Sequence, residues 1–278
     1  MAEPLGGITY NPSGIATVAD LTKGVDEARI RADLAQIKPL TDEIRIYNVG
    51  YGLDRVVTIA AEMGFKITVG ISLGQDAARN AAETTRAIGV VRHNRKAVSR
   101  VIVGNETIQR GTRTVDQLIQ VMDEVRRGIG GAIPVGTAEA WQVWLKQPRL
   151  AAASAFIGAN ILPYVDGVGA REAAMYVHQR VEELRDAYPG RPIMIAETGW
   201  PSVGPQHEDA VPSPANQALF VSAFASGGTA RTHSYFMLEA YDQPGKAARE
   251  SDPASWGLFE RTRVAKPVVH SLRKLSAR

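Results

Sequence analysis

The sequence contains no cysteine, which excludes disulfides, zinc–thiolate sites, iron–sulfur clusters and thiol nucleophiles at once. It also lacks any stretch near the roughly 18 to 20 apolar residues that would span a bilayer. Its charges nearly cancel, with 32 Lys and Arg against 29 Asp and Glu and a formal net charge of +3. An excess this small predicts no nucleic-acid partner, and the basic run from Arg92 to Lys96 is typical of a solvated helix end.

Metal-ligand spacing is missing as well. The five histidines are scattered along the chain, as His93, His178, His207, His233 and His270. We therefore expect no metal site and no metal-dependent hydrolase. The glycines of Gly128-Ile129-Gly130-Gly131 follow a helical pattern and precede a strand-like run, which is typical of a connector and not of a dinucleotide fingerprint. No cofactor is predicted.

The 278 residues fit one large domain or two small ones. Eight short apolar runs, most of them continuous, alternate with helical periodicity, as in parallel strands covered on both faces. The runs are Gly7 to Tyr10, Glu43 to Asn48, Lys66 to Ser72, Arg100 to Gly104, Ile133 to Thr137, Ala155 to Leu162, Pro192 to Ala196 and His233 to Leu238. This alternation predicts an α/β fold, a single (β/α)8 TIM barrel over residues 1–278. A doubly wound open sheet is the alternative, but it normally carries a glycine-rich phosphate turn after an early strand.

Two helix starts are marked by capping residues. Thr114 and Gln117 form a capping box ahead of an apolar pattern with helical spacing. Ser213 followed by Pro214 gives an N-cap and a proline at the first helical position. Helices are therefore expected to begin directly after Thr114 and Ser213.

Two of the predicted strands end in glutamate, and in such a barrel the active site lies at the carboxyl ends of the strands. The fourth strand ends in Asn105 and Glu106, and the seventh ends in Glu197. A lone glutamate here is more often the first polar residue of a loop. Strands 4 and 7 face one another across the barrel mouth, however, and a retaining glycosidase requires two carboxyl groups about 5 to 5.5 Å apart. No predicted strand ends in lysine, so Schiff-base chemistry is not expected.

Aromatic residues crowd toward the same end of the predicted barrel. They are Tyr10, Tyr47, Tyr164, Trp200, Tyr235 and Tyr241 at or just past strand ends, with Trp141, Trp144 and Trp256 in the following loops. Aromatic faces stack on the apolar faces of pyranose rings, so this crowding favours a glycan cleft. Any one of them is more often a packing residue, and Trp141 and Trp144 are spaced to seat a helix on the barrel.

At these residues the chain resembles glycoside hydrolase family 17, the β-1,3-glucanases and β-1,3-glucanosyltransferases, and most nearly its compact bacterial members. The matching segments recur in order along nearly the whole chain. They are Gly7-Ile8-Thr9-Tyr10, Arg45-Ile46-Tyr47, Val103-Gly104-Asn105-Glu106, Thr137-Ala138-Glu139, Leu162-Pro163-Tyr164, Glu197-Thr198-Gly199-Trp200-Pro201-Ser202 and Trp256-Gly257-Leu258-Phe259.

The resemblance implies roles for individual residues. Glu106 would be the acid/base, Glu197 the nucleophile, and Asn105 a hydrogen-bond partner of the sugar 2-hydroxyl. Glu239 would contact sugar hydroxyls, and Lys246 would help to orient the cluster. The other predicted substrate-binding residues are Tyr10, Arg45, Tyr47, Glu139, Tyr164, Trp200, Tyr235 and Trp256.

We therefore expect a retaining enzyme acting on β-glucan oligosaccharide or polysaccharide, with β-1,3-glucanosyl transfer favoured over endo-β-1,3-glucan hydrolysis. A glycan-binding barrel without catalysis is a weaker alternative, because Glu106 and Glu197 are both present, and a barrel enzyme unrelated to glycans is weaker still. The resemblance to bacterial members implies a domain of a larger membrane-associated glucan-synthesising protein on the periplasmic or extracellular side. No signal peptide is visible, and the abrupt start at Met1 suggests a trimmed sequence whose natural form carries a leader or membrane segments.

Overall fold

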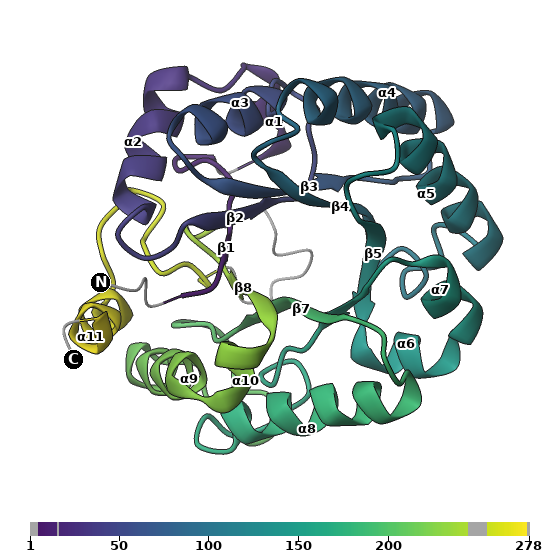
Figure 1. Cartoon of the computed structure of the whole chain (residues 1–278). Coiled ribbons are helices and arrows are strands. Elements are labelled where there is room, and N and C mark those ends of the chain that lie inside the picture. Colours follow the sequence, from purple (N-terminus) through teal and green to yellow (C-terminus); the bar gives the residue numbers. More distant parts are fainter. Residues whose placement is uncertain (1–4, 16, 244–254, 277–278) are drawn as a thin grey trace. The chain divides into compact units, whose positions relative to one another are not determined.

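The computed structural model describes residues 5–15, 17–243 and 255–276. Among them, eight strands close into a barrel in the order β1 to β8 (Figure 1). The strands are β1 (Ile8–Thr9), β2 (Glu43–Ile46), β3 (Lys66–Ile71), β4 (Val98–Asn105), β5 (Val135–Ala140), β6 (Ile157–Asn160), β7 (Ile193–Gly199) and β8 (Ser234–Leu238). Helices lie between them, so the predicted (β/α)8 barrel is confirmed.

The helices follow the strands in the order the sequence predicts. They are α1 (Val18–Thr22), α2 (Glu27–Ile37), α3 (Asp54–Glu62), α4 (Ala77–His93), α5 (Val115–Ile129), α6 (Trp141–Lys146), α7 (Pro148–Ala153), α8 (Ala173–Ala187), α9 (Pro214–Ser226), α10 (Gly228–Thr232) and α11 (Pro267–Ser276). The basic run after Arg92 is the solvated end of α4, as expected. Within the described residues, no helix combines the length and apolarity that crossing a membrane requires.

Both predicted helix starts are confirmed. Thr114 accepts from the main-chain N–H of Gln117, whose side chain accepts in return from the N–H of Thr114, so the capping box is complete. Ser213 caps α9 through the N–H of Asn216. Helix α5 ends at Gly130, whose left-handed conformation (φ 76°) makes it a connector as predicted.

Three strands extend past their predicted carboxyl ends, whereas β1, β2, β3 and β6 end one or two residues earlier than predicted. β4 extends to Asn105, β5 extends to Ala140, and β7 extends to Gly199. Glu197 therefore lies within β7 and does not follow it. The reason is pairing, because the N–H of Ile161 donates to the carbonyl of Glu197 at 2.9 Å and continues the ladder past the apolar run.

The chain packs into two compact units. The β2–β6 unit consists of Glu43–Asn160 and Val181–Ala196. Its strands β2 to β6 pair in parallel, and helices α3, α4 and α5 lie along the outside of β3 and β4 (Figure 1). Strand β3 is buried at every residue after Lys66, which explains its continuous apolar sequence.

The β1–β8 unit consists of Met1–Asp42, Ile161–Arg180 and Glu197–Arg278. In it β1 pairs in parallel with β8, with Ile8 opposite Met237. Helices α9 and α11 pack against each other, so the last helix of the chain covers an element that follows β7.

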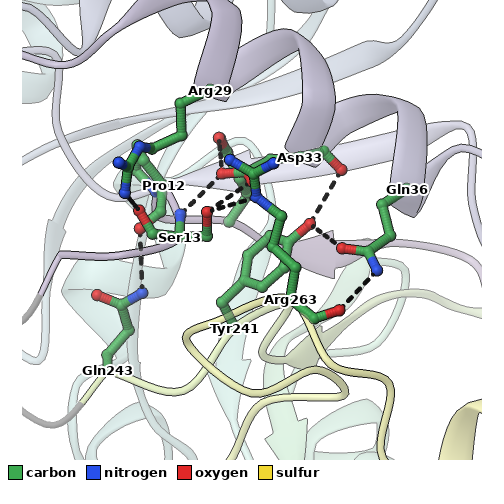
Figure 2. Close-up of polar contacts among 9 residues, drawn as sticks. Pro12, Ser13, Arg29, Asp33, Gln36, Tyr241, Gln243 and Arg263 are labelled. Carbon is green, nitrogen blue, oxygen red and sulfur yellow. Dashed lines mark hydrogen bonds and ion pairs between the residues drawn. The ribbon is translucent and has the colours of Figure 1, made fainter.

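A buried carboxylate ties together three segments of the β1–β8 unit (Figure 2). Asp33 on α2 has no exposed surface. Its Oδ2 accepts from the Tyr10 hydroxyl at 3.0 Å and from the main-chain N–H of Ser13 at 2.7 Å. Its Oδ1 accepts from the Ser13 hydroxyl at 2.7 Å and pairs with Nε of Arg263 at 2.9 Å. The Tyr241 hydroxyl donates to the main-chain carbonyl of Asp33 at 3.1 Å.

We expect Asp33→Ala to lower the free energy of unfolding by about 3 to 5 kcal/mol, because it leaves the Arg263 guanidinium and three other donors without their acceptor. Denaturation in urea, followed by circular dichroism, measures this change. Arg29→Ala is the matched control, since Arg29 contributes one hydrogen bond to the Ser13 carbonyl at 3.0 Å and its loss should cost about 1 kcal/mol. Equal losses in the two variants would contradict a central role for Asp33.

Candidate functional site

The loop after β4 holds Glu106 in a strained backbone conformation. Glu106 has φ 54° and Gly104 has φ 76°, both in the left-handed region. A Cβ at position 104 would lie 2.3 Å from the hydroxyl of Thr107, so only glycine fits there. The N–H of Glu106 donates to the carbonyl of Ala138 at 2.8 Å, which fixes the strained residue to β5. Strain of this kind costs about 1 to 3 kcal/mol and clusters at functional sites.

Two side chains donate to the Glu106 carboxylate, one of them buried and the other exposed. Asn160, the last residue of β6, donates from Nδ2 to Oε1 at 3.0 Å. Arg110 donates to Oε2 at 2.9 Å, with its own side chain 63% exposed. Glu106 keeps 18% of its side chain exposed. Each oxygen of the carboxylate thus has one donor, and part of the side chain stays accessible.

Asn105 presents a defined amide group beside Glu106. Its Oδ1 accepts from Nη2 of Arg45 at 2.9 Å and from Nδ2 of Asn160 at 3.3 Å. Because a guanidinium only donates, the oxygen must face Arg45 and the amide nitrogen must face away. Within the described residues this nitrogen has no acceptor, so it is available to a ligand hydroxyl.

The predicted substrate residue Arg45 supports its neighbours. It is 1% exposed, and Nη1 donates to the main-chain carbonyl of Ala196 at 2.5 Å while Nη2 donates to Asn105. The guanidinium carbon lies 4.8 Å from the centre of the Tyr47 ring. Both Nη atoms of Arg45 thus bond to the protein, and contact of Arg45 with substrate stays a prediction. Tyr47, which is partly exposed, stays a prediction.

Glu139 is also a supporting residue. It has no exposed surface, and its two oxygens accept from the main-chain N–H groups of Ile108 at 2.8 Å and Gln109 at 3.2 Å. Glu139 thus fixes the turn that follows Glu106, and its expected contact with substrate stays a prediction. Burial raises the pKa of the Glu139 carboxyl, and the Glu106 charge adds to the rise against the lowering effect of the main-chain donors.

Asn160 is the residue that sequence reasoning missed. It is 3% exposed and contacts both Asn105 and Glu106. Its own Oδ1 is buried without a hydrogen-bond donor in the part of the chain that the structure describes. The only feature of the sequence that marks Asn160 is an amide side chain near the end of an apolar run.

The β1–β8 unit contains the second glutamate. Glu197 lies in β7 and is 5% exposed. Glu239 follows β8 directly, is 1% exposed, and its carbonyl accepts from the N–H of Leu258 at 2.8 Å. Both carboxyl groups are therefore close to fully buried at the carboxyl ends of their strands, where barrel enzymes place catalytic groups. Their roles stay predictions.

Two of the predicted aromatic contacts pack against helices. The Tyr10 hydroxyl donates to Asp33 of α2 in the network of Figure 2, and the residue is 1% exposed. Tyr235 packs edge-on against Phe224 of α9 at 4.9 Å between ring centres, and burial raises its pKa to about 12. Contacts of Tyr10 and Tyr235 with sugar stay predictions.

Three further aromatic residues pack on each other. Tyr164 meets Trp256 edge-on at 5.6 Å and Trp200 at 6.1 Å. Trp200 has no exposed surface, and its stacking on sugar stays a prediction. Tyr164 is 4% exposed and donates to the carbonyl of Pro205, and Trp256 is 8% exposed. Contacts of these two rings with sugar stay predictions.

Two other expectations concern Trp144 and Lys246. Trp144 seats α6 on the barrel, as its spacing suggested, by donating from Nε1 to the carbonyl of Gly158 at 2.8 Å. Lys246 lies outside the described residues. Among the described residues, no group of three His, Asp or Glu side chains is arranged to hold a metal ion.

Comparison with known proteins identifies the family. The model of the BtgE/BtgC glycoside hydrolase domain matches residues 7–257, and the chain belongs to this family. This agrees with the resemblance to glycoside hydrolase family 17.

Its relatives include fungal proteins. A probable β-glucosidase btgE from Aspergillus clavatus is 30% identical over 84% of this chain and 42% of its own length. The cell surface mannoprotein MP65 of Candida albicans is 28% identical over 91% of this chain and 66% of its own length. The chain therefore spans less than half of the Aspergillus protein.

Solved structures share the fold. An active-site mutant of the Rhizomucor miehei β-1,3-glucanosyltransferase, in complex with laminaritriose, has a TM-score of 0.82 and 22% identity, over 95% of this chain and 96% of that chain. An endo-laminarinase from Formosa has a TM-score of 0.77 and 16% identity, over 98% of this chain and 87% of that chain.

We expect Glu139→Gln to be less stable than the wild type by about 1 to 3 kcal/mol, because the amide nitrogen opposes a main-chain donor. The gap should narrow as the pH rises above 4.5, the ordinary value for glutamate. The folded state holds the Glu139 proton more tightly than the unfolded state, so its contribution is full below that pH and is lost as the carboxyl ionises. Denaturation in urea at a series of pH values measures the gap. A gap that widens with pH would contradict the raised pKa.

Proposed function

We propose that the chain is a retaining β-glucan-active enzyme, and specifically a β-1,3-glucanosyltransferase. Glu106 is its acid/base and Glu197 its nucleophile. The observation that carries the proposal is the arrangement after β4, where a strained Glu106 is held by Asn160 beside the oriented amide of Asn105. Support for the substrate comes from the family and from the Rhizomucor miehei protein, which is described as a β-1,3-glucanosyltransferase in complex with laminaritriose.

The first half of the reaction breaks the glycosidic bond. The Glu197 carboxylate attacks the anomeric carbon while protonated Glu106 donates its proton to the leaving oxygen, giving a covalent glycosyl-enzyme and a free sugar hydroxyl. The amide nitrogen of Asn105 donates to the sugar 2-hydroxyl, a contact that strengthens as positive charge develops on the ring.

The second half decides between transfer and hydrolysis. Ionised Glu106 removes a proton from the acceptor hydroxyl, whose oxygen attacks the anomeric carbon and releases Glu197 as a carboxylate. Loops after β6 and β7 expose apolar side chains, with Val165 53%, Val203 64% and Val211 42% exposed. Such a surface favours the apolar face of an acceptor sugar over ordered water. A bound acceptor also has a high effective concentration, which lets it compete with water.

The wider setting is part of the same proposal. Residues 1–278 act as one catalytic barrel on β-glucan outside the cytoplasm, as part of a larger, membrane-associated glucan-synthesising protein. The name of the Candida albicans relative, a cell surface mannoprotein, supports the location. The Aspergillus relative is more than twice the length of the matched region, which supports the presence of further domains.

Chemical rescue tests the two glutamates separately. We expect Glu106→Ala and Glu197→Ala each to lose about three or more orders of magnitude in turnover of laminari-oligosaccharide. With an activated aryl β-glucoside and azide, Glu106→Ala should give a β-glycosyl azide, because azide attacks the glycosyl-enzyme. Glu197→Ala should give an α-glycosyl azide, because azide replaces the nucleophile itself. Proton NMR of the products reads the anomeric configuration, and interchanged products would reverse the two roles.

Product analysis tests transfer. At millimolar laminari-oligosaccharide we expect products longer than the starting sugar to appear early in the reaction, since the acceptor site is then occupied. Mass spectrometry and linkage analysis over a time course measure them, and a dilute-substrate reaction, in which water should win, is the control. Exclusive formation of shorter sugars at every concentration would make the protein an endo-β-1,3-glucan hydrolase.

A further inference from the structure

A hollow lies at the carboxyl ends of β2 and β3, within the β2–β6 unit. It has a volume of about 470 Å³, which is within the range of small-molecule sites. Its walls come from the loop after β2, the loop after β3 and the first turns of α4, and include Asn48, Tyr51, Ser72 and Gln75. None of these four residues was singled out by the sequence, and the proposed reaction uses none of them.

The wall of this hollow is fixed by a buried carboxylate. Glu83 of α4 accepts from the main-chain N–H of Val49 at 2.7 Å, and main-chain donors at Gly50 and Ser72 also contact it. A Cβ at position 50 would lie 2.9 Å from the Glu83 carboxylate, so glycine permits this close approach. The loops after β2 and β3 are thereby held to one side chain and to each other.

This anchored loop displays an aromatic ring. Tyr51 has φ 56°, in the left-handed region, and is 42% exposed. A strained non-glycine residue persists where its surroundings over-determine it, and such positions cluster at ligand sites. The neighbouring Asn48 has a side-chain oxygen that is buried without a donor among the described residues. Rotation of that amide offers a hydrogen bond to a ligand hydroxyl.

The charges around the hollow are already paired. Nε of Arg79 lies 3.5 Å from Oδ2 of Asp76, and Nη1 of Arg86 lies 3.6 Å from Oδ2 of Asp54. The Glu83 carboxylate accepts from main-chain donors. A neutral, hydroxyl-rich ligand with an apolar face therefore suits the hollow better than an anion. The exposed ring of Tyr51 suits the apolar face of a pyranose. The side-chain amides of Asn48 and Gln75 and the hydroxyl of Ser72 suit the hydroxyl groups at the edge of that ring.

The segment Gly70-Ile71-Ser72-Leu73-Gly74 suggests a different role, since it fits the Gly-x-Ser-x-Gly pattern of a nucleophile elbow. That chemistry needs a histidine base within hydrogen-bond reach of the serine. No histidine lines the hollow. Ser72 is therefore a ligand contact here and not a nucleophile.

We propose that this hollow is a distal subsite, which binds a glucosyl residue of a β-glucan chain several sugars away from the bond that is cut. The inference rests on the proposed function, and it assigns to Tyr51 and Asn48 a preference for longer chains. Short oligosaccharides fill only the subsites near Glu106 and gain nothing from the hollow.

Binding of β-1,3-linked oligosaccharides of three to seven glucose units tests the proposal. Calorimetry uses Glu197→Gln protein, in which the substrate is not consumed. Adding Tyr51→Ala should weaken binding of the longest sugar by about fivefold, the loss expected for one aromatic contact. Binding of the trisaccharide should change by less than about twofold. Tyr51→Phe is the matched control, since it keeps the ring, and should bind all lengths as Glu197→Gln alone does.

The outcomes separate this inference from the proposed function. Equal effects of Tyr51→Ala at every length, or no effect, would overturn the distal subsite and leave the proposed function standing. If Glu197→Gln binds no β-1,3-linked oligosaccharide of any length, both fall together. Loss of long-chain binding in Tyr51→Ala with an unchanged unfolding transition supports the subsite, because a misfolded loop would also affect thermal stability.

Discussion

One buried guanidinium links residues of three strands within the β2–β6 unit. Arg45 of β2 donates to the main-chain carbonyl of Ala196 in β7 and to the side chain of Asn105 at the end of β4. Removal of a buried charge from such a set leaves its partners without their donor, which is costly. The amide of Asn105 receives its direction from the contact with Arg45. Replacement by lysine would keep the charge but lose the planar set of donors.

Much of the fold could be predicted because it follows from local patterns. Continuous apolar runs marked the strands, and the cap at Thr114 and the Ser213-Pro214 pair marked helix starts at the observed residues. The position of Glu106 at a strand end followed from the same patterns. The apolar pattern did not show that main-chain pairing continues beyond the apolar residues. That pairing places Glu197 inside β7.

The direction of individual side chains could not be predicted, because it depends on partners far away in sequence. The Tyr10 hydroxyl turns to Asp33, and Tyr235 turns to Phe224. Glu139 satisfies two main-chain donors. Asn160 gave almost no signal, since an amide ending a strand is common. Its importance comes from two contacts that exist only once β4 and β6 are placed in the same sheet order.

The Asp33 network has a consequence for the order of folding. Arg263 and Ser13, which meet each other and Asp33, are 250 positions apart in the sequence. Without the segment that carries Arg263, the Asp33 carboxylate on α2 would be buried without a paired cation. Burial of an unpaired charge is unfavourable, so the packing of α2 depends on that segment. Contacts between such distant segments carry the largest loop-closure entropy and form slowly. The Asp33 network of the β1–β8 unit is therefore complete only when the segment that follows β8 is in place.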